Sequence, residues 1–190
     1  MSRTLSAIVA VCDDWGIGRE GDMLVANRAD MRHFVRCTKG HTVILGRKTL
    51  ESFPGGRPLK DRRNIVLTRD ASFTCAGAEI AHSVDEALSL LGEDEDAWVI
   101  GGAEIYRQLL PHCTRAADTF FPNLDGEKSW RPVETDGGYV IQPGEGDEGV
   151  AFEFVTYERV EPSDADKGAR YSWFDVAVDV VSTALDHVVG

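Results

Sequence analysis

Two short motifs in this chain of 190 residues combine glycines with side chains that suit a phosphorylated ligand. The first reads Gly46-Arg47-Lys48-Thr49 and the second reads Gly101-Gly102-Ala103-Glu104. Each follows an apolar run and is expected to begin a helix, whose free N–H groups beside glycine can accept phosphate oxygens. A third apolar run ends at Thr68-Arg69, which adds a cation. Any one glycine could simply make a tight turn, but three motifs beside surplus cations favour a phosphate site, such as one for a dinucleotide.

One carboxylate is a candidate for acid–base chemistry. Asp30 lies in the first turn of a helix that is expected to begin at Asn27. The apolar stripe of this helix comprises Met31, Phe34 and Val35. A carboxylate at the border of such a stripe is partly desolvated, which suits it to bind a protonated nitrogen heterocycle or to assist proton transfer. Alternatively, Asp30 only complements the positive end of the helix dipole, and the pattern of residues leaves both interpretations open.

Strands and helices alternate along the chain and would position these motifs. Apolar runs predict strands at residues 5–11, 42–45, 64–68, 97–100 and 149–160. Helices are predicted to begin at Asn27 and near Arg47, and to span residues 83–91 and 103–110. The helix at 83–91 starts with a capping box, Ser83-Val84-Asp85-Glu86. This alternation indicates an α/β layer structure with a mainly parallel sheet and antiparallel pairing at its C-terminal end.

The composition excludes several classes of protein. With 20 basic and 32 acidic side chains, a net charge of -12 and 43% hydrophobic residues, the chain is typical of one compact domain. This charge argues against binding to nucleic acid or to an anionic membrane, and no apolar run reaches the ~20 residues of a membrane span. The four cysteines are scattered, which predicts reduced thiols in a cytoplasmic protein and no metal site. The segment Lys39–Asp70, however, holds eight basic and three acidic residues, so we expect the ligand to be a small polyanion.

Eight stretches of the sequence resemble dihydrofolate reductases, in that family's order and spacing. They are Ile17-Gly18, Ala29–Phe34, Val43–Thr49, Glu51–Phe53, Gly56–Leu59, Arg62–Val66, Val99–Tyr106 and Ala117–Pro122. The resemblance covers residues 5–160 and implies a central, mostly parallel sheet with antiparallel C-terminal strands and helices on both faces. It also implies NADPH-dependent reduction of 7,8-dihydrofolate to 5,6,7,8-tetrahydrofolate, by hydride transfer to C6 with protonation at N5. We expect one such domain over residues 1–160 and an extension over residues 161–190.

The resemblance implies a substrate site built around two charged residues. Asp30 would be the catalytic carboxylate, which binds the 2-amino group and a ring N–H of the pterin and helps to protonate N5. Arg62 would hold the α-carboxylate of the substrate's glutamate, a task for which a bidentate guanidinium is suited. The apolar residues around the pterin and aminobenzoyl groups would be Ile8, Val9, Met31, Phe34 and Phe53.

The resemblance also implies a set of residues that bind NADPH. Ala10 and Ile17 would contact the nicotinamide, with Gly18 in a mobile loop over it. The phosphate groups would lie on the residues Gly46, Arg47, Lys48 and Thr49 for the pyrophosphate and Thr68 and Arg69 for the 2′-phosphate. The centre of the cofactor would lie on Gly101, Gly102, Ala103, Glu104, Ile105 and Tyr106. The peptide bond between the two glycines is expected to be cis.

The sequence departs from the family in three places. Met23 is followed by Leu24-Val25 where the family has Pro-Trp, so the tryptophan that orders an active-site water is missing. About ten residues are missing between Pro111 and Ala117, and they would include a strand whose threonine bonds the catalytic carboxylate. Either the polypeptide contains residues that this sequence omits, or the sheet pairs its neighbours differently. Because the loss of an interior strand would leave backbone groups unpaired, we favour the first and expect a break in the chain between Arg115 and Ala117. The tail after Val160 has no counterpart in the family.

Two other functions are compatible with the sequence. A riboflavin-pathway pyrimidine reductase would share the cofactor features but not the pair formed by Asp30 and Arg62. A non-catalytic NADPH- or folate-binding protein would explain the lost tryptophan. As partners we expect dihydrofolate and antifolate inhibitors, neither nucleic acid nor membrane, and a monomer or a homodimer formed through the tail.

Overall fold

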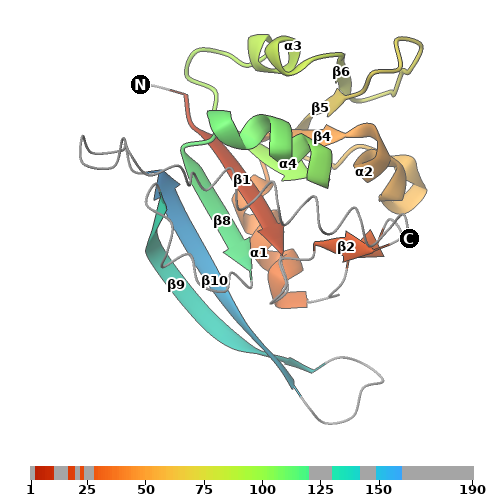
Figure 1. The fold of residues 1–190 in the computed structure, drawn as a ribbon. Helices are drawn as coiled ribbons and strands as arrows, with labels where there is room; N and C mark the ends of the chain where they lie inside the picture. The colour runs from red at the N-terminus through yellow and green to blue at the C-terminus, as the bar shows by residue number, and fades with distance from the viewer. Residues whose placement is uncertain are drawn as a thin grey trace, which may run out of the picture.

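The computed structural model describes residues 3–10, 17–19, 22–23, 28–119, 130–141 and 149–159. Its main feature is an eight-stranded sheet with the strand order β6-β5-β4-β7-β1-β8-β10-β9 (Figure 1). The six strands from β6 to β8 run parallel, and β10 runs antiparallel to both β8 and β9. The predicted architecture, a mostly parallel sheet with antiparallel C-terminal strands, is therefore confirmed.

The parallel strands are short and most are buried on both faces, as their apolar sequences predict. They are β1 (Leu5–Ala10), β4 (Thr42–Gly46), β5 (Arg63–Leu67), β6 (Glu79–Ala81), β7 (Ala97–Gly101) and β8 (Arg115–Thr119). The two antiparallel strands are longer, and they are β9 (Trp130–Ile141) and β10 (Gly149–Arg159). A separate pair consists of β2 (Gly18–Arg19) and β3 (Asp22–Met23).

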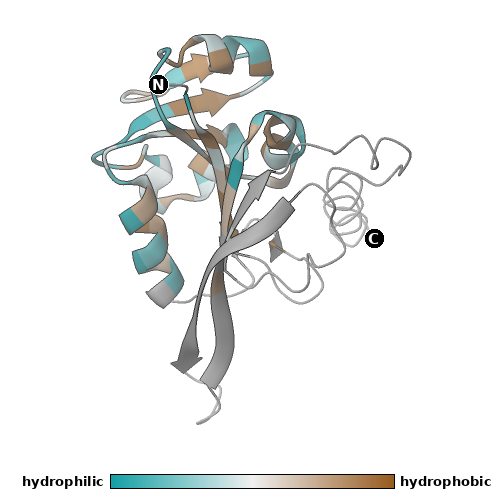
Figure 2. Ribbon diagram, turned by 90° about the vertical axis from the view of Figure 1, so that its left-hand side faces the viewer, coloured by the Kyte–Doolittle hydropathy of each residue, from teal (hydrophilic) through white to brown (hydrophobic). Residues whose placement is uncertain are grey.

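Helices cover both faces of the sheet. The helices are α1 (Arg28–Thr38), α2 (Arg47–Ser52), α3 (Val84–Ser89) and α4 (Ala103–Leu109), with 3-10 turns at Pro54–Gly56 and Leu110–His112. Side chains of α3 and α4 share a hydrophobic cluster with Ile44 of β4. Side chains of α1 and α2 share a second cluster with the neighbouring Val43 and Leu45. Successive residues of β4 thus point to opposite faces, each covered by two helices. In Figure 2 the central strands are mainly hydrophobic, whereas α1 mixes hydrophilic and hydrophobic residues.

The predicted start of α3 is confirmed by its cap. The hydroxyl of Ser83 accepts a hydrogen bond from the backbone N–H of Glu86 at 3.1 Å. The carboxylate of Glu86 accepts from the N–H of His82 at 2.6 Å, one residue before the partner that a capping box predicts. These contacts satisfy one N–H group in the first turn, that of Glu86, and one just before the helix, that of His82.

The expectation of a chain break between Arg115 and Ala117 is wrong. Both residues belong to β8, which is continuous and pairs with β1 on one side and β10 on the other. This strand begins four residues after Pro111 and ends at Thr119. It therefore includes Ala117 and Asp118, which the resemblance placed after the missing strand. The sequence pattern missed it because its alanines are not the β-branched or aromatic residues that mark a strand. In the register of β8 and β1, Thr119 lies opposite Ala10.

Two further strands of the eight-stranded sheet were not predicted, nor was the separate pair β2 and β3. β6 has only three residues, which is too short for a pattern of alternation. β9 contains Pro132, Gly137 and Gly138, which are typical of turns. Within the described residues β9 pairs with β10 alone, and a proline is tolerated in such an edge strand because its missing N–H leaves no ladder partner unsatisfied.

Several predictions fall on residues outside the described ranges. They concern the cap at Asn27, the segment Leu24-Val25, the domain boundary at residue 160 and the extension over 161–190. In the part of the chain that is described, none of the helices has the length and hydropathy that a bilayer span requires.

Candidate active site

Asp30 lies in the first turn of α1, and only 8% of the residue is exposed. The next residue, Met31, is 49% exposed, so burial is specific to the aspartate. By contrast, Asp85 in the first turn of α3 is exposed, as expected for an aspartate that only complements a helix dipole. The burial of Asp30 therefore favours a chemical role over the dipole interpretation.

Three of the predicted apolar substrate residues lie together on the α1 face of the sheet. Ile8 is buried in the second cluster, and Phe34 and Phe53 pack against that cluster. Val9 instead packs against the cluster beneath α3 and α4, because successive residues of β1 point to opposite faces. The structure thus brings Ile8, Phe34 and Phe53 together and separates Val9 from them.

Arg62 is held beside the last turn of α1 by two neutral acceptors. Its Nε donates to Thr38 Oγ1 at 2.8 Å and its Nη1 donates to the carbonyl of Lys60 at 2.8 Å. The guanidinium carbon lies 5.7 Å from the centre of the Phe34 ring. Burial lowers the pKa of Arg62, and the nearby charge of Asp61 offsets part of this effect. The side chain is therefore partly desolvated, and neither hydrogen-bond acceptor neutralises its charge.

The two glycine motifs meet where β4 and β7 end side by side. A Cβ atom at Gly46 would lie 2.9 Å from the side chain of Ile105, so α4 could not approach β4 as closely. Gly101 has a φ of +114°, and its peptide bond to Gly102 is cis as predicted. Close packing and backbone geometry thus require these glycines, and their contact with phosphate stays a prediction.

The predicted phosphate-binding cations differ in their surroundings. Arg47 forms an ion pair with Glu51 at 2.9 Å and lies over the ring of Phe73, 6.0 Å from its centre. Lys48 and Arg69 are exposed and form no ion pair among the described residues. The two free cations are therefore better suited than Arg47 to meet a phosphate group without first breaking a contact.

Thr68 lies in a polar cluster that the sequence did not reveal. Its hydroxyl accepts from the N–H of Asp70 at 3.1 Å, and its carbonyl accepts from Nδ1 of His82 at 3.0 Å. Hydrogen bonds from Ser72 lower the pKa of Asp70, with smaller contributions from the charges of Arg47 and His82. The end of β5 thus carries a carboxylate and an imidazole beside the predicted cations.

The remaining predicted cofactor residues mostly pack the protein interior. Tyr106 is buried, and its hydroxyl donates to the carbonyl of Ile8 at 2.5 Å, which joins α4 to β1. Ile105 is also buried, and Glu104 bonds to Arg107 and Gln108 of its own helix. Ala10 and Ile17 are half-buried, and Gly18 pairs with Met23.

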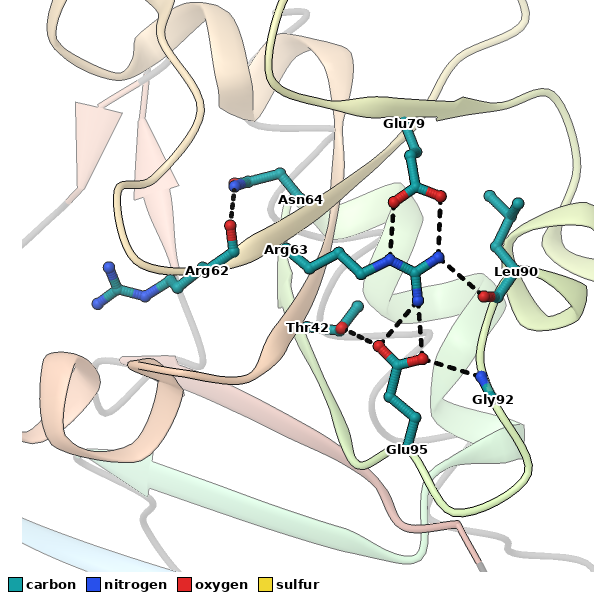
Figure 3. A network of polar contacts seen from close by, with 8 residues as sticks. All are labelled: Thr42, Arg62, Arg63, Asn64, Glu79, Leu90, Gly92 and Glu95. Atoms are coloured by element: carbon teal, nitrogen blue, oxygen red, sulfur yellow. Dashed lines mark hydrogen bonds and ion pairs between the residues drawn. The ribbon is translucent and has the colours of Figure 1, made fainter.

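A charged network around Arg63 was not singled out by the sequence. The guanidinium bonds the carboxylates of Glu79 and Glu95 and the carbonyl of Leu90, at distances from 2.7 to 2.9 Å (Figure 3). Glu95 also accepts from Thr42 and from the N–H of Gly92. Burial alone would raise the pKa of Glu95, but these hydrogen bonds outweigh it and lower the pKa to about 2.

Among the described residues, Cys37, Cys75 and Cys113 form no disulfide bond with one another. Across the described ranges, no group of three His, Cys, Asp or Glu side chains is placed to hold a metal ion. The arrangement therefore consists of a buried carboxylate, an arginine held by neutral groups and two glycine-led turns with cations.

Comparison with known proteins agrees with this arrangement. The family model described as dihydrofolate reductase matches residues 4–159. A dihydrofolate reductase of Staphylococcus haemolyticus is 36% identical over 166 residues, which cover 82% of this chain and 96% of that protein. The enzyme of Rattus norvegicus is 36% identical over 189 residues, which cover 84% of this chain and 99% of that protein.

A solved structure is similar over the same region. Dihydrofolate reductase from Enterococcus faecalis, complexed with NADP(H) and RAB-propyl, shares 30% sequence identity with a TM-score of 0.70. The alignment covers 83% of this chain and 97% of that one. Because the family model spans most of the sequence and whole relatives align with it, the chain belongs to the dihydrofolate reductase family, whose enzymes use NADPH.

Proposed function

We propose that this chain reduces 7,8-dihydrofolate to 5,6,7,8-tetrahydrofolate with NADPH, and that Asp30 assists protonation at N5. The observation that carries this proposal is the spacing of two charged groups along α1. Asp30 is buried in the first turn of α1, and Arg62 is hydrogen-bonded to Thr38, the last residue of this helix. Eight residues of helix separate these points, a rise of about 12 Å. A ligand with a nitrogen heterocycle at one end and a carboxylate at the other fits this spacing.

The protein's own residues support the binding of such a ligand. As a carboxylate, Asp30 accepts N–H groups of the pterin, because a buried carboxylate bonds strongly to a cationic or N–H-rich ring. In its protonated form the same group assists protonation at N5. Ile8, Phe34 and Phe53 exclude water from the apolar middle of the ligand. Arg62 binds the α-carboxylate, since no carboxylate among the described residues is hydrogen-bonded to its guanidinium.

The residues present also fit NADPH, which supplies the hydride when bound. Lys48 and Arg69 offer exposed cations to its phosphate groups. A Cβ at Gly102 would come within 3.2 Å of Thr49 Oγ1, so only glycine keeps that space open beside the threonine. We also infer that the scattered cysteines stay reduced in a protein of the cytoplasm. Antifolates with a protonatable heterocycle should compete with the substrate for Asp30.

The test is a steady-state assay of NADPH oxidation with dihydrofolate. We expect turnover by the wild type and a loss of at least about a hundredfold in kcat for Asp30→Asn, the range typical of a lost proton-transfer group. Asp85→Asn is the matched control, because Asp85 is also a first-turn aspartate but is exposed.

The same assay separates the alternative functions. NADPH binding without turnover in the wild type would favour the non-catalytic binding protein. Reduction of a riboflavin-pathway pyrimidine in place of dihydrofolate would favour the pyrimidine reductase. An Asp30→Asn variant as active as Asp85→Asn would contradict the role of Asp30.

A further inference from the structure

We propose that Thr38 is a positioning residue, which holds the guanidinium of Arg62 so that its two terminal nitrogens face the α-carboxylate of the substrate. This inference rests on the proposed function of Arg62. It concerns a residue that touches neither substrate nor cofactor and acts through the arginine alone.

The hydroxyl of Thr38 has a fixed direction. Thr38 is 0% exposed, and its Oγ1 lies 2.7 Å from the carbonyl of Phe34. A carbonyl can only accept, so the single proton of the hydroxyl is donated there. Its oxygen is therefore left to accept from Nε of Arg62, which lies 2.8 Å away. The arginine thus meets a fixed acceptor and not a rotating hydroxyl.

This contact decides which nitrogens of the guanidinium remain available to a ligand. Of the five N–H groups of Arg62, the Nε–H goes to Thr38 and one Nη1–H goes to the carbonyl of Lys60. Within the described residues no other hydrogen bond to this guanidinium is found. Nε and Nη2 can no longer bind a carboxylate together, because the Nε–H is already donated to Thr38. Nη1 and Nη2 each keep at least one N–H group. The two terminal nitrogens are therefore the part of the guanidinium that still offers N–H groups to a carboxylate.

The loop that carries Arg62 is fixed independently of Thr38. The buried side chain of Asn64 exchanges hydrogen bonds with the N–H and carbonyl of Leu59 at 2.9 Å. It also donates to the carbonyl of Arg62 at 3.0 Å (Figure 3). The backbone of this loop is thus anchored to β5, and Thr38 adds the bond that joins the Arg62 side chain to α1.

Thr42 provides a matched control for a purely structural effect. It is also a buried threonine, and its hydroxyl donates to the charged side chain of Glu95. Thr42 belongs to the network of Arg63 and not to that of Arg62. Thr42→Val therefore removes a comparable hydrogen bond without touching the proposed carboxylate site.

The experiment compares the binding of folate with that of its α-amide, in which the α-carboxylate is neutral, by quenching of tryptophan fluorescence. We expect the wild type to bind folate more tightly than the amide. In Thr38→Val the ratio of the two Kd values should fall about tenfold, since one hydrogen bond to a charged group is lost. Thr38→Ser should keep most of the preference because it keeps the oxygen. Thr42→Val should lower the urea midpoint of unfolding and leave the preference unchanged.

The outcomes distinguish this inference from the proposed function. If the wild type binds folate and the amide equally, the role of Arg62 fails and this inference fails with it. If the wild type discriminates and Thr38→Val discriminates equally well, only the positioning role of Thr38 is overturned. Thr38→Ala removes the same oxygen without placing a new methyl group against Arg62, and it must show the same loss if Thr38→Val does not fold.

Discussion

Arg62 and Arg63 are adjacent in the sequence but are held in opposite ways. Figure 3 shows the side chain of Arg63 among carboxylates and that of Arg62 pointing away from them. Arg63 donates to two carboxylates, and its hydrogen bonds to Glu79 and Glu95 raise its pKa. Arg62 bonds a hydroxyl and a carbonyl, and burial lowers its pKa. The comparison indicates that an arginine paired with acids stabilises the fold, whereas one oriented by neutral groups keeps its charge for a ligand.

The largest expected effect on stability comes from Arg63→Ala. The variant would leave Glu79 and Glu95 without their shared cation, and Glu95 is partly buried beside Thr42. We expect a loss of about 3 kcal/mol in the free energy of unfolding, near the lower end for a buried ion pair because Glu79 is half exposed. Urea unfolding measures this loss. An unchanged midpoint would show that the network contributes nothing.

A smaller loss of folding stability is expected at acid pH. The pKa of Glu95 is about 2 in the folded chain, compared with an ordinary value of 4.5 for a glutamate. Its contribution to stability is therefore fully present above pH 4.5 and is lost as the pH falls toward 2. We expect a loss of about 2 kcal/mol, less than the full shift implies because the group is partly exposed to solvent screening.

The acid effect can be isolated by comparison with Glu95→Gln. Other carboxylates, including Asp70 and Glu79, also have lowered pKa values and contribute to acid unfolding in both proteins. The difference in unfolding free energy between wild type and variant should therefore narrow between pH 4.5 and 2. A constant difference over this range would contradict the assigned pKa.

The strands and turns with strong local signals could be predicted from the sequence. Apolar runs located β1, β4, β5 and β7, and the cap at Ser83 located α3. β8 was misjudged because alanine carries no strand signal, and β9 because its proline and glycines resemble a turn. Both strands are fixed by pairing with residues far away in the sequence, which a local pattern does not contain.

The sequence predicted which residues form the candidate site but not which groups these residues contact. The position of Asp30 at the start of a helix was evident, yet its burial depends on the packing of the whole α1 face. The local pattern likewise does not separate Arg62 from Arg63, because their partners Thr38, Glu79 and Glu95 lie 16 to 32 residues away. The charge count of the basic segment Lys39–Asp70 included both Arg47 and Arg63, although both are paired with acids.

The most direct test of the account is the KM for dihydrofolate of Arg62→Ala and Arg63→Ala, measured side by side with the KM for NADPH. We predict that Arg62→Ala raises the KM for dihydrofolate roughly thirtyfold, equivalent to about 2 kcal/mol, and leaves the KM for NADPH nearly unchanged. Arg63→Ala should leave both KM values nearly unchanged where it is folded. Equal effects of Arg62→Ala on the two KM values, or a larger effect of Arg63→Ala on the KM for dihydrofolate, would contradict the division between a ligand-binding and a structural arginine.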